Sequence, residues 1–114
     1  MINSYRFGQI VINQIHYEKD VIVFPGHVQE NWRREKGHLL KQKDIESAFE
    51  KVQPEVLIVG TGHLGAMKID PELIRFIEKE GISLYAEKTG KAVKLYNRLI
   101  LLHDKVLGAF HLTC

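Results

Sequence analysis

Alternating apolar and polar positions near the amino terminus predict a series of short strands. Residues 7–12 mark the first strand, and the runs 15–17 and 21–24 mark the next two. Polar residues separate these runs, and Pro25-Gly26 is a strong turn signal after the third. We therefore expect an amino-terminal β-meander.

The segment 27–43 is polar and has no regular spacing of apolar residues. It carries one large apolar residue, Trp32, followed by the basic residues Arg33 and Arg34. We expect a long surface loop with room for an edge strand. Trp32 either packs against the sheet or joins the guanidinium groups in a surface that binds a partner.

Three later segments repeat apolar residues at helical spacing. Asp44 is expected to cap a helix over 44–52, and Asp70-Pro71 to cap and open a second helix that Gly81 closes. A third helix is expected over residues 91–100, with Thr89 or Gly90 as its cap.

The continuous run Val56-Leu57-Ile58-Val59 is typical of a strand buried on both faces of a parallel sheet. Further strands are expected at 82–86 and 106–112. From 56 to 86 the order is strand, helix, strand, so the connection should be right-handed and the two strands parallel. The pattern predicts an α/β fold.

Composition limits the organisation and the partners of the chain. With 114 residues, 45% hydrophobic and 26% charged, we expect one domain over residues 1–114. Sixteen basic and fourteen acidic side chains give a formal charge of +2, which does not favour nucleic acid. The single cysteine, Cys114, allows no internal disulfide, so we expect a reducing cytoplasm and, without a long apolar run, no membrane insertion.

The residues Gly60-Thr61-Gly62-His63-Leu64-Gly65 spell the dinucleotide motif G-x-G-x-x-G directly after a strand, and Glu87 lies 22 residues beyond its last glycine. That function needs a helix that begins inside the motif, whereas 66–69 intervene before Asp70-Pro71. We therefore favour glycines that serve a tight turn. An anion held by the N–H groups of this loop, at the carboxyl end of a parallel strand, stays open.

The remaining reactive side chains form no complete constellation. The histidines show no metal-ligand spacing, so we expect neither a metal nor a cofactor. A nucleophilic Cys114 would need His63 or His111 as its base. Tyr96 and Asn97 reach either a cleft or the core. No catalytic residue is assigned.

Several short segments stand out together by their order and spacing: Phe7-Gly8, Asp20-Val21-Ile22-Val23, Trp32-Arg33 with Gly37-His38, Val59-Gly60-Thr61-Gly62, the stretch 92–97, and His111-Leu112-Thr113-Cys114. With these segments the chain resembles the Mth-type domain family, which includes an adipogenesis-associated Mth-domain protein and a mitochondrial complex I assembly factor. The resemblance implies a three-layer α/β fold with a mixed central sheet and an additional amino-terminal β-layer. It implies no reaction, because the family has none assigned.

Two hypotheses about function follow. The first is a non-enzymatic binding or assembly-type protein that takes a protein partner or a small anionic ligand in a cleft at the glycine loop and the Trp32 loop. Its candidate residues are Trp32, Arg33, Gly60, Thr61, Gly62, His63 and Asn97. The alternative is a small enzyme that binds an anion or nucleotide at Gly60–Gly65. The oligomeric state stays open.

Overall fold

The computed structural model describes residues 1–114. The elements in chain order are β1 (Ile2–Arg6), β2 (Gln9–Ile12), β3 (Ile15–Tyr17), β4 (Val21–Phe24), β5 (His27–Gln29), β6 (Leu39–Leu40), η1 (Gln42–Asp44), α1 (Glu46–Val52), β7 (Val56–Thr61), β8 (Lys68–Ile69), α2 (Pro71–Lys79), β9 (Ser83–Glu87), α3 (Thr89–Leu99) and β10 (Val106–His111). None of the helices is long and apolar enough to cross a membrane.

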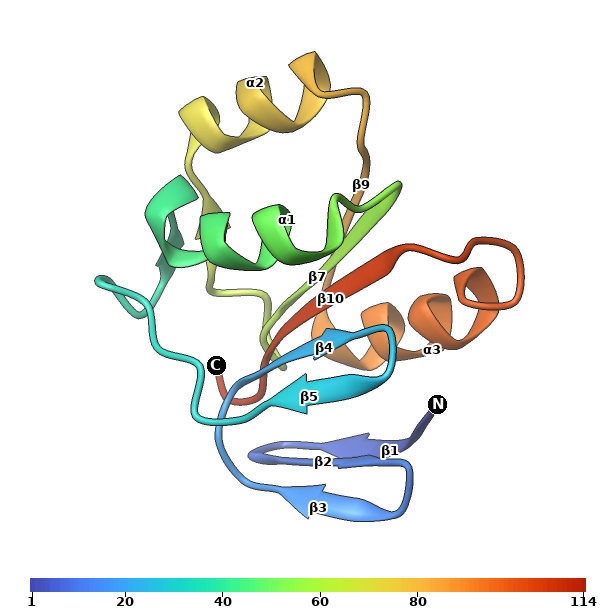
Figure 1. Ribbon diagram of the computed structural model, residues 1–114. Coiled ribbons are helices and arrows are strands. Elements are labelled where there is room, and N and C mark those ends of the chain that lie inside the picture. The colour runs from blue at the N-terminus through green and yellow to red at the C-terminus, as the bar shows by residue number, and fades with distance from the viewer.

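The central sheet has five strands in the order β5-β4-β10-β7-β9. The β7–β9 and β7–β10 pairs are parallel, whereas β4 pairs antiparallel with both β10 and β5. The two middle strands, β7 and β10, are buried along almost their whole length, which explains the continuous apolar run at 56–59. The predicted mixed α/β sheet with a βαβ unit is confirmed (Figure 1).

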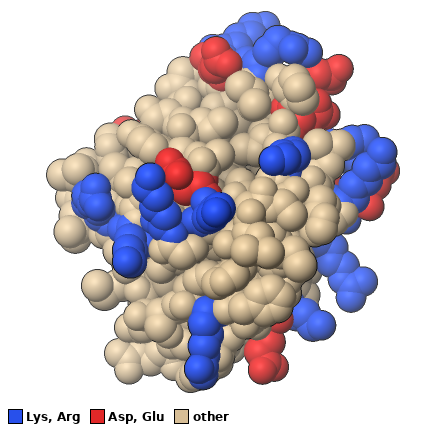
Figure 2. Space-filling model, turned by 180° about the vertical axis from the view of Figure 1, so that it is seen from behind, with Lys and Arg blue, Asp and Glu red and all other residues tan.

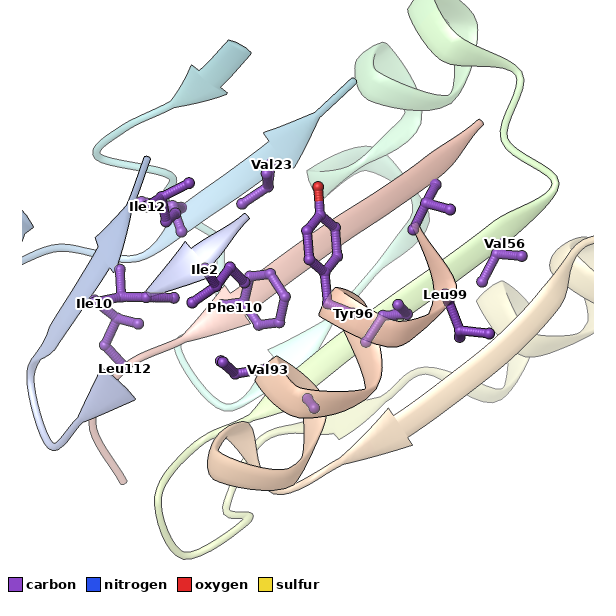
Figure 3. Packing of buried hydrophobic residues seen from close by; sticks show 14 residues of the cluster. Ile2, Ile10, Ile12, Val23, Val56, Val93, Tyr96, Leu99, Phe110 and Leu112 are labelled. Atoms are coloured by element: carbon purple, nitrogen blue, oxygen red, sulfur yellow. The ribbon is translucent and has the colours of Figure 1, made fainter. Parts of the chain in front are cut away.

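Layers cover both faces of this sheet. The helix α3 and the three-stranded sheet β1-β2-β3 lie on one face, and their apolar side chains share one cluster with β7 and β10 (Figure 3). The helices α1 and α2 cover the other face, with Trp32 and Phe24 in their cluster. The amino-terminal β-layer thus lies beside α3 on the same face of the central sheet (Figure 1).

The structure also corrects several boundaries. The strand β1 was not predicted because Asn3, Ser4 and Arg6 are polar, but these residues are exposed while Ile2 is buried. The segment 27–43 holds the edge strand β5 and also β6, which pairs with β8.

Two helices begin elsewhere than expected. Asp44 does not cap α1, whose cap is Ile45; its carboxylate instead accepts the N–H of Lys41 across the turn η1. The helix α3 begins at Thr89, two residues before the predicted start. The cap at Asp70 is confirmed, since its side chain accepts the N–H of Glu72.

Candidate functional site at the carboxyl ends of the parallel strands

The parallel strands β7 and β10 end side by side, with Thr61 paired to His111. Strand β4 runs antiparallel to β10, so Asp20, directly before β4, reaches the same edge of the sheet. Ligands of α/β sheets bind at the carboxyl ends of parallel strands. This edge is therefore the first place to look for a site.

The carboxylate of Asp20 is the centre of a buried polar cluster at this edge. It accepts hydrogen bonds from Arg34 Nη2, His111 Nδ1 and the Leu112 N–H, each at 2.8 Å. Burial alone would raise the pKa of Asp20, but the bonds from His111, Leu112 and Arg34 together lower it below its ordinary value. Asp20 is therefore a fixed anion that orients two basic side chains.

Arg34 is held by several contacts within the chain. Its Nε and Nη2 donate to the Gly37 carbonyl at 3.0 and 2.9 Å, and its guanidinium lies 4.7 Å from the centre of the Trp32 ring. Its side chain is only 4% exposed. The anion that Arg34 binds is therefore Asp20 of its own chain.

Two polar atoms in this cluster are buried without a partner, Arg34 Nη1 and His111 Nε2. With the Asp20 carboxylate as its acceptor, Nδ1 of His111 is a donor, and Arg34 Nη2 lies 3.1 Å from the same nitrogen. The exposed His38 ring lies edge-on to His111, with centroids 5.6 Å apart. The Nε2 atom of His111 is covered by protein, so this histidine presents no free nitrogen to a ligand.

The glycines of the turn are required by close approach of the chain to itself. A Cβ on Gly60 would lie 2.8 Å from Thr89 Oγ1, and one on Gly62, whose φ is +109°, would lie 2.4 Å from the Cys114 carbonyl carbon. The buried Thr89 hydroxyl accepts the Gly62 N–H at 2.9 Å and donates to the His111 carbonyl at 2.6 Å. The tight-turn interpretation of these glycines is therefore the one that the structure supports.

The N–H groups that follow Gly62 are also used within the chain. His63 N–H donates to the Thr113 carbonyl at 2.7 Å, and the N–H groups of Leu64 and Ala66 donate to the Cys114 carbonyl at 3.3 and 3.0 Å. The next helix begins only at Pro71. The dinucleotide motif thus lacks both the free N–H groups and the helix amino terminus that a phosphate needs.

Five hollows of the surface are lined by residues other than Trp32 and 60–65, so none of these five is the cleft expected at the glycine loop and the Trp32 loop. Trp32 is 4% exposed and its indole N–H donates to the Asp44 carbonyl at 2.9 Å, so of the two alternatives for this residue the structure has the packed one and not the exposed one. Of the two neighbouring candidates, Trp32 and Arg33, only Arg33 is exposed.

Asn97 lies away from this edge. Its amide oxygen accepts the Ile2 N–H at 2.8 Å, and its NH₂ donates to the Ile2 carbonyl at 2.7 Å. It therefore joins α3 to β1 and lines no site with the glycines. Four of the seven candidate residues lie together: Gly60, Thr61, Gly62 and His63. Trp32 is linked to this end of the sheet only by its backbone N–H, which donates to the Asp20 carbonyl.

Exposed side chains gather beside the glycine turn. Phe7 is 55% and Leu64 71% exposed, the His63 ring lies edge-on to Phe7 at 5.8 Å, and the Cys114 thiol is exposed without a hydrogen bond to either nearby histidine. We call these four residues, Phe7, His63, Leu64 and Cys114, the edge patch. Sequence reasoning found His63 and Cys114 but missed Phe7 and Leu64, which it treated as parts of a strand and of the glycine motif.

Comparison with known proteins gives the family. A family model described as a protein of unknown function (DUF498/DUF598) matches residues 2–111. A conserved hypothetical protein, PH1505 of Pyrococcus horikoshii OT3, is 27% identical over 100% of this chain and 99% of its own, with a TM-score of 0.83. The structure named MT938 is 26% identical over 100% and 98%, with a TM-score of 0.81.

A protein of Bordetella pertussis, described as a Mth938-like domain, shares the fold with a TM-score of 0.75 at 23% identity, over 98% of this chain and 85% of its own. The order of the elements and the amino-terminal β-layer agree with the resemblance found in the sequence. The chain belongs to the DUF498/DUF598 family of proteins of unknown function and has the Mth938-like fold.

Proposed function

We propose that this chain is a non-enzymatic binding protein of the assembly type, which docks a protein partner through the edge patch. The observation that carries the proposal is the presentation of Leu64. This side chain is 71% exposed, yet it stands on a loop in which the N–H groups of residues 63–67 all donate to backbone carbonyls. An apolar side chain on a preorganised loop binds a partner without the usual cost of ordering the loop.

The surroundings of the patch indicate the charge of the partner. The stem of Lys88 passes beside Gly65, with Cγ 3.3 Å from the place that a Cβ there would take. Lys91, Lys94 and Arg98 continue along the exposed face of α3, and the back view shows basic side chains gathered on the side that carries this helix (Figure 2).

Helix stability does not account for these charges. Lys88 and Lys91 lie at the amino-terminal end of α3, where the helix dipole disfavours a cation, and the first turn has no acidic residue. Only the exposed pair of Lys91 with Glu87, at 3.5 Å, offsets them. A partner that brings an apolar pocket flanked by carboxylates would complement both the patch and the lysines.

Photo-crosslinking tests this proposal. Benzoylphenylalanine is placed at Leu64 and, as the matched control, at Leu101, which is 82% exposed on another part of the surface. We expect one defined crosslinked protein from position 64 in living cells, none from position 101, and loss of the product when Lys88→Glu is added. Equal products from both positions, or no product from position 64, would refute the proposal.

The alternative, an enzyme that binds an anion or nucleotide at Gly60–Gly65, has less support. It needs the N–H groups that already bind Thr113 and Cys114. Its direct test is the melting temperature with millimolar inorganic phosphate or ATP. A clear increase that Gly62→Ala abolishes would favour it over the docking proposal.

A further inference from the structure

A hollow lies at the end of the central sheet opposite the edge patch. The turn between β4 and β5, the last turn of α3 and the start of β10 surround it. It measures about 270 Å³, and its walls include Val23, Phe24, His27, Tyr96, Ile100 and Val106. We call it the Tyr96 hollow. The docking proposal makes no use of it.

The hydroxyl of Tyr96 is the polar group in this hollow that has no partner in the chain. The residue is 4% exposed, and its ring packs edge-on against Phe110 with centroids 5.8 Å apart. Figure 3 shows the oxygen at the outer end of the ring, on the side where Val23 lies. The hydroxyl makes no hydrogen bond within the chain, and its oxygen is not closed off from solvent, so a ligand or water in the hollow can reach it.

Two features describe what would fit there. Aliphatic side chains form part of the wall, and His27 stacks flat on Phe24, with ring planes 8° apart and centroids at 4.3 Å. Burial raises the pKa of Tyr96 to about 12, so its hydroxyl stays protonated near neutral pH and is available as a donor. The hollow therefore combines apolar and flat aromatic surface with the Tyr96 donor, and the polar residues Asn13, His103 and Asp104 complete its wall.

We propose that the Tyr96 hollow binds a small planar aromatic molecule whose carbonyl oxygen or ring nitrogen accepts a hydrogen bond from the Tyr96 hydroxyl. The volume sets the size, because about 270 Å³ equals roughly nine water molecules. That space holds one six-membered ring with one or two small substituents. Larger ligands would extend past His27 into solvent.

Benzamide is the test probe and toluene, which has the ring but no acceptor, is the matched control. Both are titrated into ¹⁵N-labelled protein, and the amide shifts of Val23, His27, Ile100 and Val106 are followed. We expect saturable shifts in these residues, with benzamide binding about fivefold more tightly than toluene, the contribution of one neutral hydrogen bond.

Substitution separates the hydroxyl from the ring. Tyr96→Phe should weaken benzamide about fivefold and leave toluene unchanged. Tyr85→Phe, at an exposed tyrosine outside the hollow, should change neither. Because the Tyr96 hydroxyl has no partner in the chain, Tyr96→Phe should also keep the melting temperature of the native protein.

Three results would overturn the proposal. One is the absence of localised shifts with benzamide at millimolar concentration, which would leave a hollow filled by water. Another is an equal loss of benzamide and toluene affinity in Tyr96→Phe, which would assign the effect to ring packing. The third is a marked drop in melting temperature in that variant, which would mean that the hydroxyl serves the fold.

Discussion

Replacing Asp20 by asparagine tests whether the buried cluster stabilises the fold through its charge. The amide keeps the size of the carboxylate, and its oxygen can still accept the Leu112 N–H. Its NH₂ group, however, then faces the guanidinium of Arg34, so that two hydrogen-bond donors oppose each other and no bond forms between them. Arg34 is 4% exposed in its side chain and keeps only the Gly37 carbonyl as an acceptor.

The size of the effect follows from this uncompensated cation. Breaking a buried ion pair by neutralising one partner costs about 3 to 5 kcal/mol. We expect about 3 kcal/mol for Asp20→Asn, the lower end, because the bond to Leu112 survives. For a chain of 114 residues this corresponds to a fall of about 12 °C in melting temperature.

The pH dependence identifies the charge as the cause. The folded-state pKa of Asp20 is lowered below 3.8, so its stabilisation is complete well above that pH and is lost as the pH falls through the folded-state value. At low pH the wild-type carboxyl is neutral, like the amide of the variant. The two free energies of unfolding should therefore differ at pH 7 and converge as the solution becomes acidic.

Urea unfolding measures both effects, since Trp32 is the only tryptophan, is buried and lies against Arg34. Glu35→Gln is the control, because Glu35 is exposed and its pairs with Lys41 and Lys43 lie on the surface, and its midpoint should not change. The reasoning would be refuted if the free energies of unfolding of wild type and Asp20→Asn differed by less than about 1 kcal/mol, or if they differed by the same amount at pH 7 and in acid.

Two further substitutions test the packing of the glycine turn. Gly62→Ala should lower the free energy of unfolding, measured in urea, by more than about 2 kcal/mol, because the new Cβ would meet the Cys114 backbone. Gly26→Ala, also at positive φ but in open space, should lower it by about 1 kcal/mol. Equal losses of stability in the two variants would contradict the contact argument. Thr89→Val should lower the free energy of unfolding by about 2 kcal/mol or more, since it leaves the Gly62 N–H and the His111 carbonyl unpaired. Thr89→Ser keeps the hydroxyl and should retain most of the wild-type stability. Similar urea midpoints for the two variants would show that the hydroxyl bonds do not stabilise the turn.

The elements that sequence predicted best are those with strong local signals. The buried strand at 56–59 and the helix opened by Asp70-Pro71 agree with the structure, because burial on two faces and capping are encoded by neighbouring residues. The strand β1 was missed because one face of it is polar and exposed. The short strands β6 and β8 have two residues each and exist through their mutual pairing, which no local pattern reports.

The polar cluster could not be predicted for a different reason. Asp20 and His111 are 91 residues apart in sequence and meet only because β4 and β10 are antiparallel neighbours. Arg34 was noticed for its charge, but its partner is set by where the loop crosses the edge of the sheet. Asp20 itself looked like one residue of a polar turn.

The glycine motif shows what such a pattern does and does not report. Glycines at these positions indicate that something approaches the backbone more closely than a Cβ would permit. In a dinucleotide site that object is a pyrophosphate, whereas here Thr89 lies against Gly60 and the Cys114 backbone against Gly62. The glycine pattern shows that some group lies close to the backbone, but it does not show whether that group belongs to a ligand or to the protein itself. The exposed side chains that the turn supports, Leu64 and His63, therefore indicate the function better than the glycines do.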